Sequence, residues 1–345
     1  MKTNLFFLFA LSLFLPATAW GEGNLRIAFY NVENLFDTED NPKKNDNEYL
    51  PEGSRRWTNG KYRNKITNLA RVISSMGEWG YPAVIGLCEV ENGKVLDDLT
   101  MNSPLKKAGY RYVITDSPDQ RGINTALLYQ REKFKLLYHT PYTIEFPYNK
   151  RKHTRDILHV TGLVASQDTL DLFICHFPSR RGGEEESEPD RLYVASVLKA
   201  KTDSIFRVRQ NANILIMGDF NDEPSNKSIK ETLNAGTNPE PENKQLYNLS
   251  SRFEGMKNTG SYKFGRQWNL LDQVIVSGNL LKREKYKFHC LAQTLTIFQR
   301  DFMMTEDKTH GGKRLKKTFH GYKHEGGYSD HLPVYVDFFV PVPTN

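Results

Sequence analysis

The sequence predicts an α/β domain in which two packed β-sheets carry helices on their outer faces. Short β-rich runs recur along the whole chain, and several are continuously apolar, as in strands buried on both faces. Amphipathic helical patterns lie between these runs, but strand and helix do not alternate strictly. No linker rich in Pro, Gly or Ser divides the chain. One large domain is therefore expected, with its functional loops gathered at one edge.

The individual elements follow from local patterns. Strands are predicted over residues 25–30, 83–88, 110–114, 124–129, 157–165, 170–176, 213–217, 271–276 and 332–339. Apolar residues at helical spacing predict helices over residues 64–76 and 190–207, and a less regular one over 95–105. The polar, turn-rich segments 37–56, 236–244 and 306–327 are expected to be long surface loops, which are often functional in a compact domain.

Composition and charge narrow the class of protein. The 345 residues are 38% hydrophobic and 26% charged, which is typical of a globular chain with a sizeable core. The net charge of +6 is compatible with polyanionic substrates, and basic residues crowd into segments 150–155 and 308–323. The three cysteines are an odd count in apolar runs, so a disulfide framework is not expected, although a single bridge remains open. No His/Cys cluster has zinc-site spacing.

The first residues have the pattern of a secretory signal peptide. Lys2 precedes an apolar run over residues 5–15, and Ala-Thr-Ala at 17–19 resembles a cleavage site. The apolar run is short for a membrane span. We therefore expect a signal peptide at 1–19 and a single domain at 20–345. The mature protein is expected to be exported, periplasmic or secreted, monomeric and without stable membrane insertion.

The segment Gly218-Asp219-Phe220-Asn221 suits phosphate chemistry. It follows the apolar run 214–217, where a predicted strand leaves the core. Asp219 can orient or deprotonate a water molecule, and Asn221 can donate a hydrogen bond to a phosphoryl oxygen without repelling it. The same residues also favour a simple strand-to-turn exit, so this segment alone is weak evidence.

Similar polar positions recur at the ends of other predicted strands. They are Asn31, Glu89, His176, Asp219 with Asn221, Asp272, and Asp330 with His331. Strand ends hold side chains rigidly while the adjoining loops admit a substrate. A set drawn from the whole chain is hard to explain by turn chemistry alone.

These positions belong to motifs that resemble those of the endonuclease/exonuclease/phosphatase superfamily, and the chain looks like an exported bacterial-type member. The motifs are Phe29-Tyr30-Asn31-Val32-Glu33-Asn34, Leu87-Cys88-Glu89-Val90-Glu91-Asn92, Gly218-Asp219-Phe220-Asn221, Leu271-Asp272-Gln273-Val274 and Ser329-Asp330-His331-Leu332-Pro333. The resemblance covers residues 25 to 340. It implies a four-layer α/β sandwich, with two packed mixed β-sheets flanked by helices, and divalent-metal-dependent hydrolysis of phosphoesters.

The resemblance also implies a metal site. Glu89 matches the family's principal metal ligand, Asp330 helps to hold the metal, and Asn31 lies near both metal and phosphate. Carboxylate oxygens suit Mg²⁺, the expected cofactor, with Mn²⁺ or Ca²⁺ as alternatives. A plain surface carboxylate is the alternative for Glu89, but the apolar run that leads into it argues against this.

The remaining roles concern proton transfer and phosphate binding. His331 matches a histidine that contacts the scissile phosphate or transfers a proton, and Asp272 matches the carboxylate that orients it. Asp219 matches the residue that orients or activates water, and Asn221 a phosphate-binding amide. His176 matches a position that supports the leaving group or a phosphoryl oxygen. Together they imply in-line attack of water without a covalent intermediate.

Basic residues near these motifs are further candidates for phosphate binding. Arg155 precedes a predicted strand, and Ser179 and Arg180 follow His176. An arginine fork binds phosphate well, but each of the two arginines is equally compatible with a surface salt bridge. The acidic run 184–186 could neutralise the arginines.

The loops suggest the substrate. Lysines and Arg314 in the loop before Ser329 could follow a nucleic-acid backbone, and Phe319 and Tyr322 could stack on bases. An exported nuclease acting on DNA or RNA is therefore the leading hypothesis. The alternative is a phosphatase or phosphodiesterase acting on small or lipid phosphates, of the inositol phosphate or sphingomyelin type. An inactive binding protein would need a broken site, and every expected chemical group is present.

Overall fold

The computed structural model describes residues 23–77, 80–237, 240–284 and 287–341. The expected signal peptide, residues 1–19, lies outside them. None of the helices in these ranges has the length and apolarity needed to cross a membrane.

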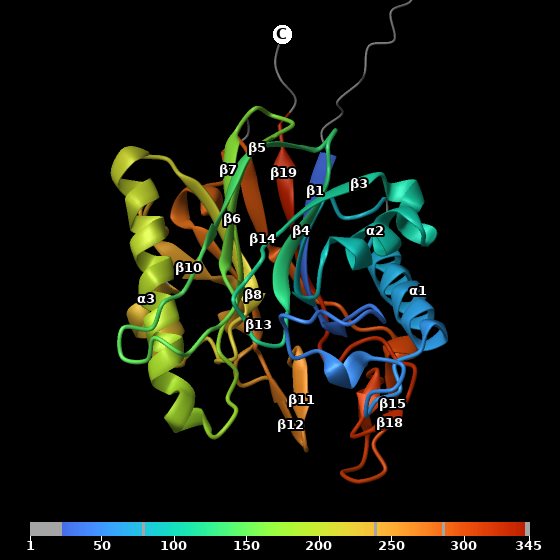
Figure 1. Cartoon of the computed structure of the whole chain (residues 1–345). Coiled ribbons are helices and arrows are strands. Elements are labelled where there is room, and N and C mark those ends of the chain that lie inside the picture. Colours follow the sequence, from blue (N-terminus) through green and yellow to red (C-terminus); the bar gives the residue numbers. More distant parts are fainter. Residues whose placement is uncertain (1–22, 78–79, 238–239, 285–286, 342–345) are drawn as a thin grey trace, which may run out of the picture.

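Two mixed β-sheets stand face to face (Figure 1). The first has the order β14 (His289–Ile297), β19 (Val334–Val340), β1 (Gly23–Leu35), β2 (Val84–Val90), β4 (Asn124–Gln130), β3 (Tyr110–Ile114). The second has the order β5 (Phe134–Tyr142), β6 (Ile157–Val164), β7 (Thr169–His176), β8 (Asn213–Asp219), β13 (Asp272–Ser277), β10 (Leu246–Asn248), β9 (Ala235–Gly236). The first and last long strands of the chain, β1 and β19, are thus neighbours inside one sheet.

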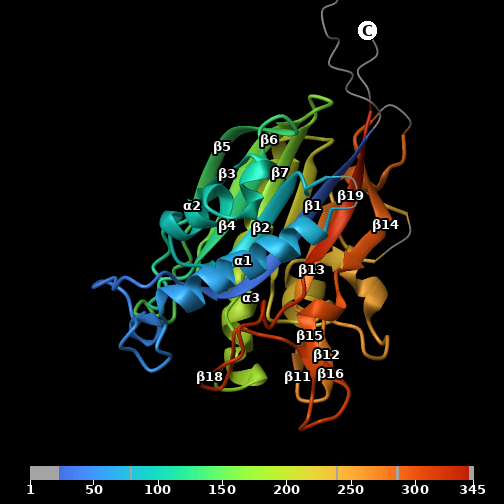
Figure 2. The ribbon, with the colours of Figure 1, turned by 90° about the vertical axis from the view of Figure 1, so that its right-hand side faces the viewer.

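Helices cover both outer faces and complete four layers. Helices α1 (Asn59–Ser75) and α2 (Gly93–Met101) lie on the first sheet, and α3 (Glu184–Val208) lies on the second (Figures 1 and 2). Apolar side chains of β8 alternate between two clusters: Leu215 packs between the sheets, and Ile216 packs under α3. Because both faces of this strand are covered, its sequence is a continuous apolar run. The four-layer α/β sandwich is confirmed.

The structure corrects several predicted boundaries. Helix α1 begins five residues earlier than predicted, and α3 begins at Glu184 instead of residue 190. The acidic residues 184–186 form the first turn of α3, where they suit the positive end of the helix dipole. Strands β5 and β14 were missed. Both lie at sheet edges, where β5 is largely exposed and β14 is mostly half-buried, so they lack the continuous apolar runs that marked the central strands.

Segment 306–327, predicted to be a loop, carries short hairpins. They are formed by β15 (Met304–Glu306) with β16 (Lys313–Leu315), and by β17 (Phe319–His320) with β18 (Lys323–His324). A further hairpin joins β11 (Tyr262–Phe264) to β12 (Gln267–Asn269). All of them lie at the end of the molecule away from the C-terminus (Figures 1 and 2). The cysteines Cys88, Cys175 and Cys290 are buried free thiols.

Candidate active site

Strand register brings the predicted polar residues together at one end of the sandwich. In the second sheet His176 is paired with Asp219, and Asp219 is paired with Asp272 on its other side. In the first sheet Asn31 is paired with Cys88, the residue before Glu89. Asn31 reaches across to the second sheet, where its Nδ2 donates to Asp219 Oδ2 over 3.0 Å. Side chains from β1, β2, β7, β8 and β13 therefore converge.

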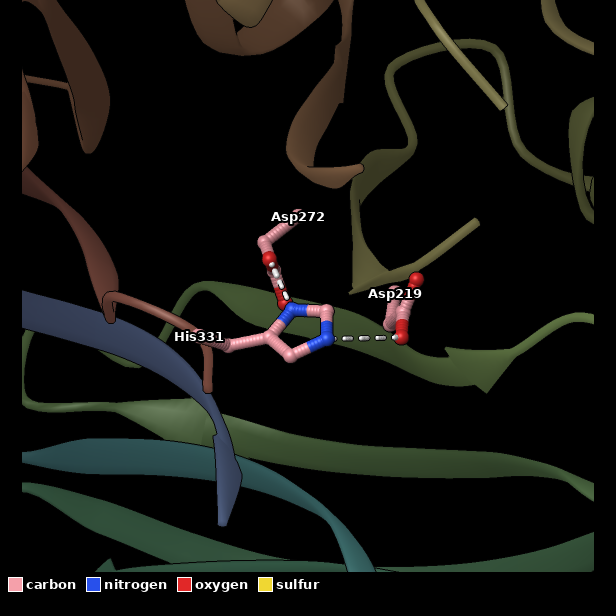
Figure 3. A group of neighbouring side chains, drawn as sticks. All are labelled: Asp219, Asp272 and His331. Atoms are coloured by element: carbon pink, nitrogen blue, oxygen red, sulfur yellow. Dashed lines mark hydrogen bonds and ion pairs between the residues drawn. The ribbon is translucent and has the colours of Figure 1, made fainter. Parts of the chain in front are cut away.

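His331 enters this group from the segment before β19. Its Nδ1 lies 2.6 Å from Asp272 Oδ2, and its Nε2 lies 3.7 Å from Asp219 Oδ2 (Figure 3). Burial disfavours the charged imidazolium, but the two carboxylates outweigh that effect and hold the pKa of His331 well above its ordinary value. At neutral pH this side chain is a cation fixed between two acids.

Asp219 is poised to accept a proton near neutral pH. Burial raises its pKa, the His331 cation lowers it, and Asp272 raises it again, with a net value of about 6. Its Oδ1 accepts a hydrogen bond from the backbone N–H of Asn221, 2.9 Å away. A carboxylate that titrates near the working pH is a suitable general base, because it is ionised yet still basic.

His176 is in the opposite electrostatic state. Its Nε2 lies 3.6 Å from Asp219 Oδ2 and 3.8 Å from Glu89 Oε1. Burial first, and then the cations Arg155 and Arg121, hold the pKa of His176 well below its ordinary value. The ring is therefore neutral at neutral pH and can donate a hydrogen bond without adding charge.

The backbone holds Glu89 in an unusual conformation. Its φ of 63° lies in the left-handed region that non-glycine residues rarely adopt. The Asn34 backbone N–H donates to Glu89 Oε2 over 2.8 Å, and Asn31 Nδ2 lies 3.5 Å from its Oε1. Asn34 also has a positive φ, of 48°. Strain of this kind persists where the surroundings impose it, often at functional sites.

An open cleft of about 590 Å³ exposes these groups to solvent. Its lining comprises Glu89, His176, Asp219, Asn221, Asp330 and His331, together with Arg121, Ser179, Arg180, Arg181, Tyr262, Phe264, Gln267 and Asn269 among others. One predicted phosphate ligand, Arg155, is placed differently from expectation. Arg155 is buried behind the cleft, where it donates to the Phe177 carbonyl oxygen. Arg180 lines the cleft, but its Nε donates to the Asn221 carbonyl oxygen over 2.7 Å and its Nη1 to Glu184 Oε2 over 2.9 Å.

Comparison with known families gives one match that covers most of the chain. The model of the endonuclease/exonuclease/phosphatase family matches residues 26–339. The chain belongs to the endonuclease/exonuclease/phosphatase family. Members of this family are phosphoester hydrolases, and this chain is accordingly an enzyme of that class. A search of curated proteins returned no match.

Solved structures of the family share the fold at low sequence identity. An endonuclease/exonuclease/phosphatase family protein from Bacteroides thetaiotaomicron is 16% identical, with a TM-score of 0.57 over 94% of this chain and 100% of that chain. The mannosyl-6-phosphatase Bt3783 of the same organism is 17% identical, with a TM-score of 0.56 over 91% and 99%. Truncated TDP2 from Caenorhabditis elegans is 16% identical, with a TM-score of 0.54 over 92% and 98%. These likenesses show the common architecture.

Enzymes of the endonuclease/exonuclease/phosphatase family use divalent metals, and the oxygen donors Glu89 and Asp330 fit such an ion. Both carboxylates face the cleft. Burial raises the pKa of Asp330, His331 lowers it, and Glu89 raises it again. A cation would relieve this repulsion. Asp219, Asp272 and His331 also form a compact acidic cluster, with ligand atoms within 4.8 Å of one another. A metal bound there would have to displace the proton of His331, because a protonated imidazole has no lone pair to offer.

Asn31 presents its amide nitrogen, not its oxygen, to this endonuclease/exonuclease/phosphatase site. Its Oδ1 accepts a hydrogen bond from the Glu33 backbone N–H over 3.0 Å, while its Nδ2 faces Asp219 and Glu89. In this position the Asn31 amide nitrogen can orient the carboxylates of Asp219 and Glu89.

Sequence reasoning missed several residues that line the cleft. Tyr262 forms an isolated β-bridge with His331, and the two ring centroids are 4.8 Å apart. Phe264 lies two residues further along the same hairpin, and Arg121 lies in the turn between β3 and β4. The sequence carried no usable signal for these three, because none of them lies at the end of an apolar run.

Proposed function

We propose that this chain is an exported, divalent-metal-dependent nuclease that cleaves phosphodiester bonds by in-line attack of water. The supporting observation is the lining of the cleft, which joins an exposed aromatic ring to several arginines beside the catalytic groups. Phe264 is 74% exposed, and Arg121, Arg180 and Arg181 line the same cleft. Nucleic-acid sites typically combine a stacking surface with cations for the phosphate backbone.

The residues divide the chemistry among them. Asp219 orients the attacking water and accepts its proton. The His331 cation, oriented by Asp272, stabilises negative charge on the phosphoryl oxygens or protonates the leaving group, and neutral His176 donates a hydrogen bond. A Mg²⁺ ion, with Mn²⁺ or Ca²⁺ as alternatives, would be held by Glu89 and Asp330 and would stabilise charge that develops on the phosphate.

Asn221 and Ser179 complete the phosphate contacts in this proposal. Asn221 Nδ2 donates to the Phe177 carbonyl oxygen over 3.0 Å, which fixes the amide at the edge of the cleft. A primary amide has a second N–H, which can donate to a phosphoryl oxygen. Ser179 is exposed and lines the cleft, so its hydroxyl is accessible to a substrate.

The basic segment before Ser329 contributes less than its sequence suggests. Phe319 is 4% exposed and packs in the core beside Trp57, so it does not stack on bases. Arg314 Nη1 donates to Glu325 over 2.7 Å, and Lys313 Nζ donates to Asp301 over 2.9 Å. These cations already have acidic partners, and so do two arginines of the cleft, Arg180 with Glu184 and Arg121 with Asp119. The electrostatic support for a nuclease is therefore modest in both places.

A phosphatase or phosphodiesterase acting on small or lipid phosphates is the second candidate. The cleft of about 590 Å³ is of a size that holds one small ligand. One structural neighbour is a mannosyl-6-phosphatase, whereas TDP2 of Danio rerio was solved with a single-stranded DNA product. A small phosphate ester would occupy the floor of the cleft without using Phe264.

We also propose that residues 1–19 are a signal peptide and that residues 20–345 form a single exported, monomeric domain. The support is the order of charged, apolar and small residues at the start of the sequence.

The test is hydrolysis by the protein comprising residues 20–345 in Mg²⁺, Mn²⁺ or EDTA. Plasmid DNA, RNA, inositol phosphates, sugar phosphates and sphingomyelin are assayed side by side. We expect nucleic acid to be nicked or digested in Mg²⁺ or Mn²⁺ and to stay intact in EDTA. Phosphate release from a small ester, with nucleic acid untouched, would assign the site to the second candidate.

A further inference from the structure

One face of α1 carries polar side chains that bind the segment leading into the catalytic histidine. Lys65 Nζ donates to the Tyr328 carbonyl oxygen over 2.6 Å, and Asn68 Nδ2 donates to the Gly327 carbonyl oxygen over 2.8 Å. Arg71 Nη1 donates to the Tyr328 hydroxyl over 3.1 Å. Residues spaced by three lie on one side of a helix, so Lys65, Asn68 and Arg71 form a row, called here the α1 row.

Lys65 is also tied to β1 through Thr318. Its Nζ donates to Thr318 Oγ1 over 2.7 Å, and both the Oγ1 and the backbone N–H of Thr318 donate to Glu33 Oε2 over 2.7 Å. Lys65 is 1% exposed, and its Nζ lies 3.6 Å from Glu33 Oε2. An ammonium group so deeply buried is costly unless it is paired and hydrogen-bonded. Glu33 supplies the opposite charge, and the Thr318 hydroxyl and the Tyr328 carbonyl oxygen accept hydrogen bonds from the ammonium group.

Backbone hydrogen bonds join the two ends of segment 316–328, so a contact with one end also restrains the other. The Tyr328 backbone N–H donates to the Lys316 carbonyl oxygen over 2.7 Å, and the Gly327 N–H donates to that of Lys317 over 3.1 Å. A Cβ at residue 327 would lie 1.9 Å from the Lys316 carbonyl oxygen, so only glycine allows this approach.

The end of this segment is joined by hydrogen bonds to residues of the site. Ser329 follows Tyr328, and its Oγ donates to the Asn31 carbonyl oxygen over 2.7 Å. The His331 backbone N–H donates to the same Oγ over 3.1 Å. Hydrogen bonds therefore run from Lys65 through the Tyr328 peptide and Ser329 to both Asn31 and His331.

We propose that the α1 row is a positioning device that sets Asp330 and His331 against the residues of the two sheets, with Lys65 as its principal positioning residue. The inference rests on the proposed hydrolysis at this site. Lys65, Asn68 and Arg71 are not among the residues that line the catalytic cleft. Lys65 and Asn68 hold the backbone of residues 326–328, and Arg71 holds the Tyr328 hydroxyl. A displacement of about 1 Å at a catalytic group can cost roughly a hundredfold in rate, so a small loosening of this segment lowers kcat.

The test compares three single substitutions in the domain of residues 20–345. Lys65→Met removes the central donor, and Asn68→Ala removes a half-buried donor with little risk to folding. Thr67→Ala is the matched control, because Thr67 is exposed on the same helix and its hydroxyl bonds only to the carbonyl oxygen of Arg63 among the described contacts. For each protein, kcat and KM are measured together with amide hydrogen exchange over residues 316–332.

We expect Lys65→Met to lower kcat about tenfold to a hundredfold and Asn68→Ala to lower it several-fold, with KM within about twofold of wild type. Both should speed exchange over residues 316–332 more than over β8. If wild type hydrolyses no phosphoester, the proposed function fails; unchanged exchange in Lys65→Met and Asn68→Ala would separately refute the anchoring role.

Discussion

Asp219 is flanked by two histidines in opposite states, and this arrangement gives the site both a cation and a neutral donor. The His331 pKa is raised chiefly by Asp272 and Asp219 against the effect of burial, whereas the His176 pKa is lowered by burial and by nearby arginines. Two chemically identical side chains thus acquire different roles from their surroundings. The neighbours that cause the difference lie far apart in the sequence.

Replacement of Glu89 tests the metal site directly. Glu89→Gln keeps the shape of the side chain and its acceptor for the Asn34 N–H, but removes the charge that would bind a cation. We expect kcat with Mg²⁺ to fall roughly a hundredfold or more, while the far-ultraviolet circular dichroism spectrum stays the same. The matched control is Glu185→Gln, which changes an exposed carboxylate at the start of α3. Near-normal turnover by Glu89→Gln would contradict the proposed site.

Asp219 is also predicted to reduce stability at neutral pH. Its folded-state pKa of about 6 lies above the unfolded value near 4, so the folded protein loses stability as pH rises between these values. Asp219→Asn avoids that loss. In EDTA the variant should melt roughly 2 °C or more above wild type at pH 7.5, with little difference at pH 4, and it should be inactive. Melting curves between pH 4 and pH 7.5 check the direction of this effect. A larger increase in melting temperature at pH 4 than at pH 7.5 would refute it.

At the scale of elements, the hairpin β11–β12 connects His331 to the rim of the cleft. The Leu332 N–H donates to the Ser261 carbonyl oxygen over 2.7 Å, and the Asp272 N–H donates to Ser261 Oγ over 3.0 Å. The base of the hairpin is therefore bonded to both sides of the Asp272–His331 pair. Its other end carries the exposed ring of Phe264.

Removal of that ring should separate the two candidate functions. If Phe264 stacks on a base, Phe264→Ala should lower kcat/KM for single-stranded DNA about tenfold, because such stacking contributes roughly 1–3 kcal/mol per base. Hydrolysis of bis(p-nitrophenyl) phosphate should change by less than about twofold. Tyr138→Ala serves as the control, because Tyr138 is 51% exposed on β5 and lies outside the cleft. Equal losses on both substrates would count against stacking.

The elements also show how far the sequence can be interpreted. Central strands such as β8 were predictable because both of their faces are covered, and polar residues at their ends pointed to the site. Edge strands such as β5 were not, because solvent on one side removes the apolar run. Arg180 and Arg155 had a suitable charge and place in the sequence, but their partners, among them Asn221 and Phe177, are set by packing that local patterns do not record.

At the scale of the molecule, a net charge of +6 and the arginines of the cleft imply a salt-dependent affinity for polyanions. If two phosphates are neutralised, raising salt from about 50 to 200 mM should weaken binding of nucleic acid roughly tenfold. KM for DNA should therefore rise steeply with salt, and KM for a small monoanionic diester should rise far less. An equal rise of KM with salt concentration for the two substrates would argue against a polyanionic substrate.

The pairing of β1 with β19 has a consequence for the order in which this enzyme gains its activity. A ribosome makes Asn31 among the first residues of the domain and His331 among the last, and the two are joined through Ser329 only when the final strand takes its place. A chain that is still being synthesised holds Asn31, Glu89 and Asp219 but lacks His331. The proposed site is therefore complete only after translation has passed residue 331 and β19 has paired with β1.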